Sequence, residues 1–211
     1  MVVAARLCGS PRVDAYLLVI VGHVCYGRTM NDSKSRRPFD AEQIKSINQA
    51  VTMAEELVSN FFKMSASQWL RPKYDVKTLI DLSPTEIVDG PFAQIIRYEG
   101  QRKGSPLGSE AYDYYKICLQ DHAVLSTVEN TNGLRLLPFC LYVIVHELVH
   151  IVRFSKFLQN FNASPNEKLA EEHRVHHITH QILANVPLSG LDAVMGYYRS
   201  WRTPLESLSD P

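Results

Sequence analysis

Two histidines and a glutamate lie inside the apolar stretch LYVIVHELVHIVRF at residues 141–154. His146 and His150 are four residues apart, so on a helix both imidazoles project from one face, about one turn apart. At that spacing two neutral imidazole nitrogens can bind one zinc ion. Glu147 points about 100° away from His146, where it can reach a water molecule without binding the ion. The H-E-x-x-H pattern therefore predicts a zinc site whose glutamate acts as a base.

The apolar surroundings of this pattern favour the metal-site interpretation. Two histidines and a carboxylate buried in an apolar helix cost free energy unless they are paired or bound to a metal. Pro138 suits the first turn of a helix, and no helix breaker follows it as far as Phe154. Because the stretch is apolar nearly all round, we expect a central helix. The alternative is a pair of core histidines whose polar atoms are satisfied by hydrogen bonds.

A zinc site needs a third protein ligand, and the segment EKLAEEHRVHHITHQIL at 167–183 offers several. On a helix, an apolar arc is defined by Val175, Ile178, Ile182, Leu183 and Val186. Glu171 and Glu172 fall within this arc or at its edge, and His176 lies just beyond its flank, so these three are the inward candidates. Three other histidines project to the opposite side and are predicted to form a solvated polar face: His173, His177 and His180.

Residues 140–185 resemble the gluzincin zinc peptidases, the thermolysin-like group. These enzymes carry HExxH on one helix and a glutamate ligand on a following helix, about twenty residues later, where it opens an E-x-x-x-D pattern. Glu172 lies 22 residues beyond His150 and matches that ligand. His176 stands where the group has an acidic residue, which leaves it as an orienting hydrogen-bond partner or an alternative ligand. HELVHIVRFSK lacks the H-x-x-G-x-x-H continuation of metzincins.

The resemblance implies a zinc-dependent metallopeptidase with one Zn²⁺ held by His146, His150 and Glu172, acting on a peptide or protein. Zinc lowers the pKa of a bound water toward about 7 and polarises the carbonyl group. Glu147 would take the proton of this water and pass it to the leaving amine. A second oxyanion donor is usually needed. The candidates, none with a motif, are Arg153, Tyr197 and Tyr198.

Three other functions compete with the peptidase. A di-iron protein needs two E-x-x-H motifs, but only Glu147 to His150 supplies one, since Arg174 and Val175 stand three residues after the paired glutamates at 171–172. A non-catalytic metal-binding protein, regulatory or structural, would keep the ligands without needing Glu147. An interaction protein without metal would use its apolar helices to bind a partner.

The elements that position these residues are predicted to form an α+β, helix-rich, zincin-like fold, in which the HExxH helix is followed by a second ligand-bearing helix. Residues 40–62 form an amphipathic helix, with Asp40 as N-cap and Gln43 completing a capping box. Segments 92–99 and 112–121 flank turn residues and predict a hairpin, whose edge is a place for an extended peptide to bind. The second segment equally suits the start of a helix running into HAVLSTVEN.

The composition of the 211 residues is that of an ordinary globular protein, with 45% apolar and 21% charged residues. Lys plus Arg equals Asp plus Glu, 22 each, so no basic field attracts nucleic acid. No apolar run approaches the ~18 residues of a membrane span. The four cysteines show no CxxC spacing and favour a reducing, cytoplasmic location. Nothing in the sequence indicates an oligomeric state.

The N-terminal region is predicted to be an extension or linker at 1–38, ahead of a single catalytic domain at 39–211. Its apolar stretch, Tyr16 to Val21, follows two arginines and faintly resembles a signal sequence, but His23 interrupts it and no clean cleavage site follows. The favoured interpretation is an edge strand or a tail. Met30 is an alternative start of the protein.

Overall fold

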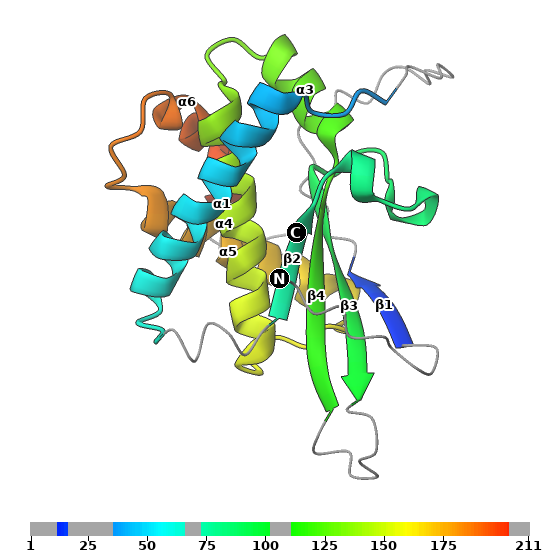
Figure 1. Cartoon of the computed structure of the whole chain (residues 1–211). Helices are drawn as coiled ribbons and strands as arrows, with labels where there is room; N and C mark the ends of the chain where they lie inside the picture. The colour runs from blue at the N-terminus through cyan, green and yellow to red at the C-terminus, as the bar shows by residue number, and fades with distance from the viewer. Residues whose placement is uncertain (1–11, 17–35, 66–72, 102–110, 203–211) are drawn as a thin grey trace.

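The computed structural model describes residues 12–16, 36–65, 73–101 and 111–202, which form a mixed, helix-rich α+β structure (Figure 1). This confirms the expected class. The chain runs through the following elements: β1 (Arg12–Tyr16), α1 (Ala41–Phe61), β2 (Lys73–Lys77), η1 (Leu79–Asp81), η2 (Pro84–Glu86), β3 (Ala93–Gln101), β4 (Ala111–Leu119), α3 (Asp121–Asn130), α4 (Leu136–Ser155), α5 (Pro165–Leu183), α6 (Leu191–Tyr197) and η4 (Arg199–Arg202).

The strands form one sheet with the order β1-β3-β4-β2. Strands β3 and β4 pair antiparallel, with Ala93 opposite Leu119, which confirms the predicted hairpin. The second segment is a strand, and a separate helix, α3, begins just after it. β1 pairs antiparallel with β3, and β2 pairs parallel with β4. Both edges of the hairpin are therefore already hydrogen-bonded within the chain, so a peptide cannot add to either edge without displacing a strand.

The N-terminal region contributes β1 to this sheet, as the edge-strand interpretation expected, although the strand ends at Tyr16, where the apolar stretch begins. Residues 1–11 and 17–35 lie outside the described residues. They include most of the stretch compared above with a signal sequence, and Met30.

Helix α1 begins at the predicted cap. The Asp40 carboxylate accepts hydrogen bonds from the backbone amides of Glu42 and Gln43, and the Gln43 side chain accepts one from the Asp40 amide. These contacts satisfy amides that have no partner inside the helix. The apolar face that follows is buried at Ala50, Ala54 and other positions and packs on α4. The small alanine side chains let the two helices approach closely.

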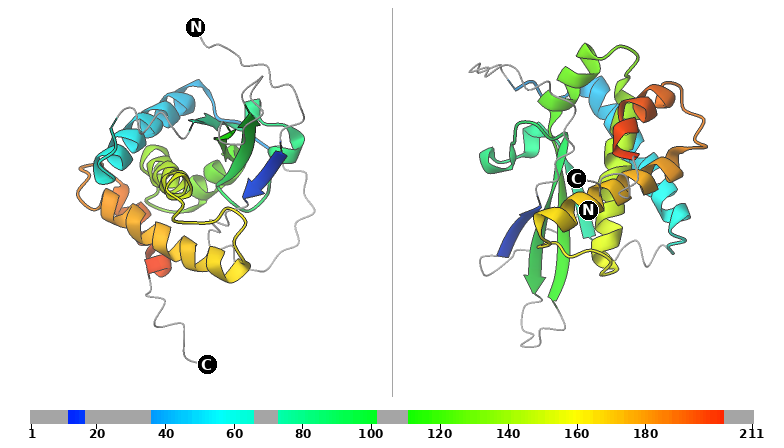
Figure 2. Two further views of the ribbon diagram at one scale, coloured as in Figure 1. Left: turned by 90° about the horizontal axis from the view of Figure 1, so that it is seen from below. Right: turned by 180° about the vertical axis from the view of Figure 1, so that it is seen from behind.

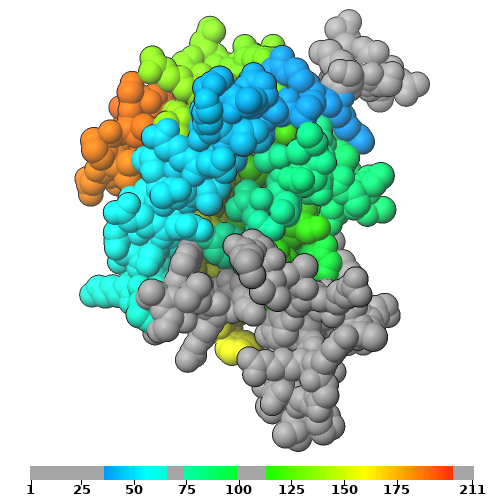
Figure 3. Space-filling view, viewed as in Figure 1, coloured from blue at the N-terminus to red at the C-terminus, as the bar shows by residue number. Residues whose placement is uncertain are grey.

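Helix α4 is the centre of the molecule. Every residue from Pro138 to Phe154 is buried, as its continuous apolar sequence predicted. Figure 2 shows α4 nearly end-on in its left view, with α1, α5 and the sheet around it. Figure 3, which has the orientation of Figure 1, shows α1 forming much of the surface that covers it on that side. The histidines of HExxH are thus held on the least solvated helix of the fold.

The apolar character of α4 has a further consequence. By length and composition, this helix meets the requirement for a membrane span, which differs from our expectation that no segment would approach it. However, 89% of its most apolar window is buried inside the protein. Central helices of globular domains pass the same test, so the burial explains the composition.

Candidate metal centre

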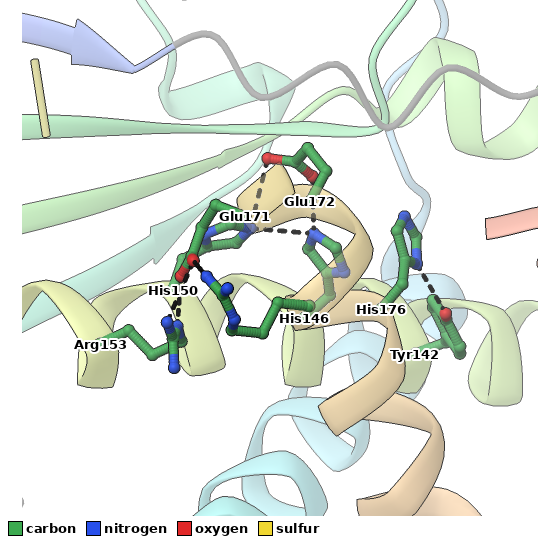
Figure 4. Close-up of polar contacts among 8 residues, drawn as sticks. Tyr142, His146, His150, Arg153, Glu171, Glu172 and His176 are labelled. Carbon is green, nitrogen blue, oxygen red and sulfur yellow. Dashed lines mark hydrogen bonds and ion pairs between the residues drawn. The ribbon is translucent and has the colours of Figure 1, made fainter. Parts of the chain in front are cut away.

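Helices α4 and α5 bring the predicted ligands together. Helix α5 begins after Ser164, whose side chain accepts from the Glu167 amide while the Glu167 carboxylate accepts from the Ser164 amide. This capping box fixes where the helix starts and therefore which residues face α4. Figure 4 shows Glu172 of α5 reaching over the imidazoles of His146 and His150 on α4.

Three short distances define the centre. Nε2 of His146 and Nε2 of His150 lie 3.1 Å apart. Oε2 of Glu172 lies 3.3 Å from Nε2 of His146, and Oε1 lies 3.5 Å from Nε2 of His150. In a tetrahedral zinc site with ligands at about 2.0–2.2 Å, neighbouring ligand atoms are roughly 3.3 Å apart. The three distances fit that geometry.

Hydrogen bonds alone do not account for these three contacts. A neutral imidazole carries one ring proton, so the two Nε2 atoms hold at most one proton each. If both Nε2 atoms donate to Glu172, the two N–H groups face each other at 3.1 Å. If His150 donates to His146 instead, the bare Nε2 of His146 faces the carboxylate at 3.3 Å. Either arrangement leaves one repulsive contact, whereas a cation between the three groups makes all of them attractive.

The charges of the centre suit a divalent cation. His146 is fully buried, and burial lowers its pKa to about 4, so its imidazole is neutral at pH 7 and keeps a lone pair. For Glu172 burial acts to raise the pKa, but His150 and His146 outweigh it and hold the pKa well below its usual range. A neutral imidazole and an ionised carboxylate are the ligand types that zinc prefers.

Glu147 is the least satisfied group of the site. Its side chain is fully buried, and within the described residues neither carboxylate oxygen has a hydrogen-bond partner. Burial, and then the charge of Glu172, raise the pKa of Glu147 well above its usual range. A buried polar group without a partner typically costs about 1–3 kcal/mol, and more if it is charged. Burial and the missing partners make Glu147 a candidate functional residue.

Glu171, the neighbouring candidate, is engaged elsewhere. Its carboxylate accepts two hydrogen bonds from Arg153, through Nε and through Nη2, the latter at 3.0 Å. It also accepts one from Nη1 of Arg174 at 2.8 Å. The structure thus brings Glu172, and not Glu171, to the histidine pair. The same ion pair engages Nε and Nη2 of the Arg153 guanidinium, one of the candidate oxyanion donors.

Comparison with known protein families, curated proteins and solved structures found no match to this chain.

His176 lies beside the histidine pair, fully buried. Its ring centroid is 4.4 Å from that of His146, and one ligand atom each of His146, Glu172 and His176 lie within 4.8 Å of one another. Nδ1 of His176 is 2.8 Å from the Tyr142 hydroxyl, and Nε2 has no hydrogen-bond partner in the part of the chain that the structure describes. The position allows both predicted roles, an alternative ligand or a hydrogen-bond partner.

The prediction for the other histidines of α5 is partly wrong. His177 is exposed and His173 is half-buried, but His180 is only 5% exposed and packs edge-on against Tyr142, with ring centroids 5.5 Å apart. The sequence defined a single apolar arc, whereas this end of α5 lies against α4 and its aromatic residues. A wider arc of the helix is therefore covered.

The remaining oxyanion candidates belong to an aromatic cluster. Tyr198 stacks on Tyr142, with ring centroids 4.1 Å apart and planes 3° apart, and its buried hydroxyl lacks a partner among the described residues. Tyr197 is half-buried and packs against Phe139. Sequence reasoning missed Tyr142, although it precedes His146 by four residues and must share its face of α4. That spacing is the signal that was available.

Proposed function

We propose that this protein is a zinc-dependent hydrolase with a zincin-like fold, and that it cleaves peptide bonds. The observation that supports the proposal is the set of three contacts among His146, His150 and Glu172, which a bound cation would make attractive together. Glu147, the residue after His146, supports catalysis. Its carboxylate has no hydrogen-bond partner among the described residues, and a site that only binds a metal does not need it.

The residues of the centre then have distinct tasks. Bound zinc would supply a Lewis acid that acidifies water and polarises a carbonyl oxygen. His146, His150 and Glu172 would hold the ion. Glu147 accepts the proton of the attacking water, the oxygen bonds to the carbonyl carbon, and the carbon–nitrogen bond breaks as the amine takes up that proton. The low polarity around α4 strengthens each of these electrostatic interactions.

A second function, a non-catalytic metal-binding protein, is favoured by one observation. His146, Glu147, His150 and His176 are all 0% exposed, so a peptide reaches them only if the covering residues move. Structural zinc sites are closed in this way, whereas catalytic sites keep an open position. The two functions share the ligands and differ in whether Glu147 matters.

The test begins with the zinc content of the purified protein and of its Glu172→Ala and His176→Ala variants, by elemental analysis. Near-stoichiometric zinc, lost with Glu172→Ala, supports the centre. No zinc in the wild type, even after zinc is added back, refutes it.

The second step asks whether the centre is catalytic. Zinc-loaded wild type and Glu147→Gln are incubated with a mixed peptide library, and the products are read by mass spectrometry. Cleavage by the wild type alone, with equal zinc in both proteins, supports the peptidase. Bound zinc without cleavage supports the non-catalytic protein.

A further inference from the structure

The function proposed above requires a donor to the carbonyl oxygen, and His176 is placed to supply it. His176 follows Glu172 by four residues on α5, so the two side chains leave the same face of the helix one turn apart. A ligand atom of each lies within 4.8 Å of the other and of His146. This is the one group of three possible metal ligands found among the residues that the structure describes, so His176 lies at the centre itself.

The ring of His176 is held on several sides. Trp201 stacks on it with ring centroids 5.0 Å apart, and Tyr198 lies at 5.4 Å. The Tyr142 hydroxyl, 2.8 Å away, engages Nδ1. These contacts fix the plane and the rotation of the ring, so Nε2 has one direction only. A fixed donor costs no reorganisation when charge develops, which is the requirement for stabilising a transition state.

The Tyr142 contact links the proton of the hydroxyl to the protonation of the ring, because the hydroxyl can donate to Nδ1 or accept from it. A neutral imidazole has one N–H group. If the Tyr142 hydroxyl donates to Nδ1, then Nε2 carries the proton and is a donor. Nε2 is buried and, within the described residues, has no acceptor. Buried donors are nearly always paired, so the acceptor is expected to come from a bound molecule.

We propose that Nε2–H of His176 donates a hydrogen bond to the carbonyl oxygen of the peptide as negative charge develops on it, and that Tyr142 positions the ring. The inference rests on the proposed function. His176 is then a catalytic residue and not a metal ligand. The ligand set is complete without it, because His146, His150 and Glu172 already show the 3.1–3.5 Å spacing of three tetrahedral positions.

The test uses zinc and acetohydroxamate, a small probe whose carbonyl and charged oxygens bind zinc. Zinc stoichiometry and the acetohydroxamate Kd are measured by elemental analysis and calorimetry on the full chain. The proteins are wild type, His176→Phe, His176→Gln, Tyr142→Phe and, as a control on the exposed face of α5, His177→Phe. Circular dichroism of each establishes that it is folded.

We expect near-stoichiometric zinc in all five proteins. Acetohydroxamate should bind His176→Phe about tenfold more weakly than wild type, which corresponds to about 1.4 kcal/mol for one hydrogen bond to a charged group. His176→Gln keeps an N–H donor and should recover part of the loss. Tyr142→Phe should weaken binding less than His176→Phe, and His177→Phe should not change it. A residue that only packs would show no difference between Phe and Gln.

Each other outcome is informative. Loss of zinc from both His176 variants would make His176 a ligand and overturn the inference while leaving the zinc centre standing. Equal acetohydroxamate affinity in wild type and His176→Phe, or no binding to the zinc-loaded wild type, would overturn it as well. Absence of zinc from the wild type would instead refute the proposed function itself.

Discussion

Changing the adjacent glutamates of α5 to glutamine is predicted to have different effects. Glu171→Gln should lower the stability of the fold, and Glu172→Gln should lower the affinity for zinc. Glu171 is 0% exposed and pairs with Arg153, whose side chain is 10% exposed. Breaking a buried ion pair from one side leaves an unpaired buried charge and costs about 3–5 kcal/mol. Because the amide introduced by Glu171→Gln would still accept one hydrogen bond, we expect the lower end, about 3 kcal/mol. The pair with Arg174, half exposed, adds less than about 1 kcal/mol.

The assay is urea unfolding of the zinc-free proteins, followed by circular dichroism, together with zinc affinity by chelator competition. With a urea dependence of about 2–3 kcal/mol per molar, Glu171→Gln should unfold at roughly 1 M lower urea. It should still bind one zinc ion. Glu172→Gln should lose more than about 100-fold in zinc affinity, because removing a partner of a ligand already costs 10–100-fold. Glu56→Gln, exposed on α1, is the control and should change neither quantity.

The opposite pattern would refute the reasoning. If Glu171→Gln released zinc from a stable protein and Glu172→Gln kept it, the arrangement of α5 against α4 described above would be wrong. Equal stability of Glu171→Gln and wild type would show that the Arg153 pair does not hold the two helices together.

Three further predictions concern the metal, the pH and the helix cap. Removing zinc with a chelator should lower the melting temperature by about 8–16 °C if zinc was present at 1,000 times its Kd, since such binding is worth about 4 kcal/mol. In the zinc-free protein His146 should contribute a loss of about 3 kcal/mol between pH 6.5 and pH 4, because burial lowers its pKa to about 4 and the unfolded chain binds the extra proton. His176, whose pKa is also lowered by burial, acts in the same direction. Glu147 opposes this trend, because its raised pKa makes the stability fall as the pH rises above 4.5. In urea unfolding, the stability of zinc-free Glu147→Gln should therefore rise more steeply with pH than that of the zinc-free wild type. Ser164→Ala should cost about 1 kcal/mol in the same urea assay by removing the cap of α5, with zinc stoichiometry unchanged.

The features that the sequence predicted correctly are those that depend on neighbours along the chain. The capping box at Asp40 involves residues three apart, and the central position of α4 follows from its continuous apolar run. The face shared by His146 and His150 follows from helical geometry alone. Such relations are the same in any fold that contains the helix, so no knowledge of the tertiary structure is needed.

The features that the sequence could not decide depend on how two helices cross. Glu171 and Glu172 differ by one position, and a helical wheel places both near the apolar arc. Only the packing of α5 on α4 directs Glu171 to Arg153 and Glu172 to the histidine pair. The burial of His180 was missed for the same reason, because it results from the contact with Tyr142 and not from its own neighbours in sequence.

The choice between a metal site and a hydrogen-bonded histidine pair also depends on how α5 packs on α4. In sequence both alternatives look alike, since each requires two polar side chains on one face of an apolar helix. The structure adds a third group, Glu172, at the same distance from both imidazoles as they are from each other, within 0.4 Å. Two Nε2 protons cannot make all three contacts attractive, whereas the proposed cation would. If the two histidines only filled the core, one ring would be expected to turn toward a separate acceptor. Yet Nδ1 of the buried His146 has no hydrogen-bond partner among the described residues. Its Nε2 and Nε2 of His150 both face the carboxylate of Glu172 (Figure 4).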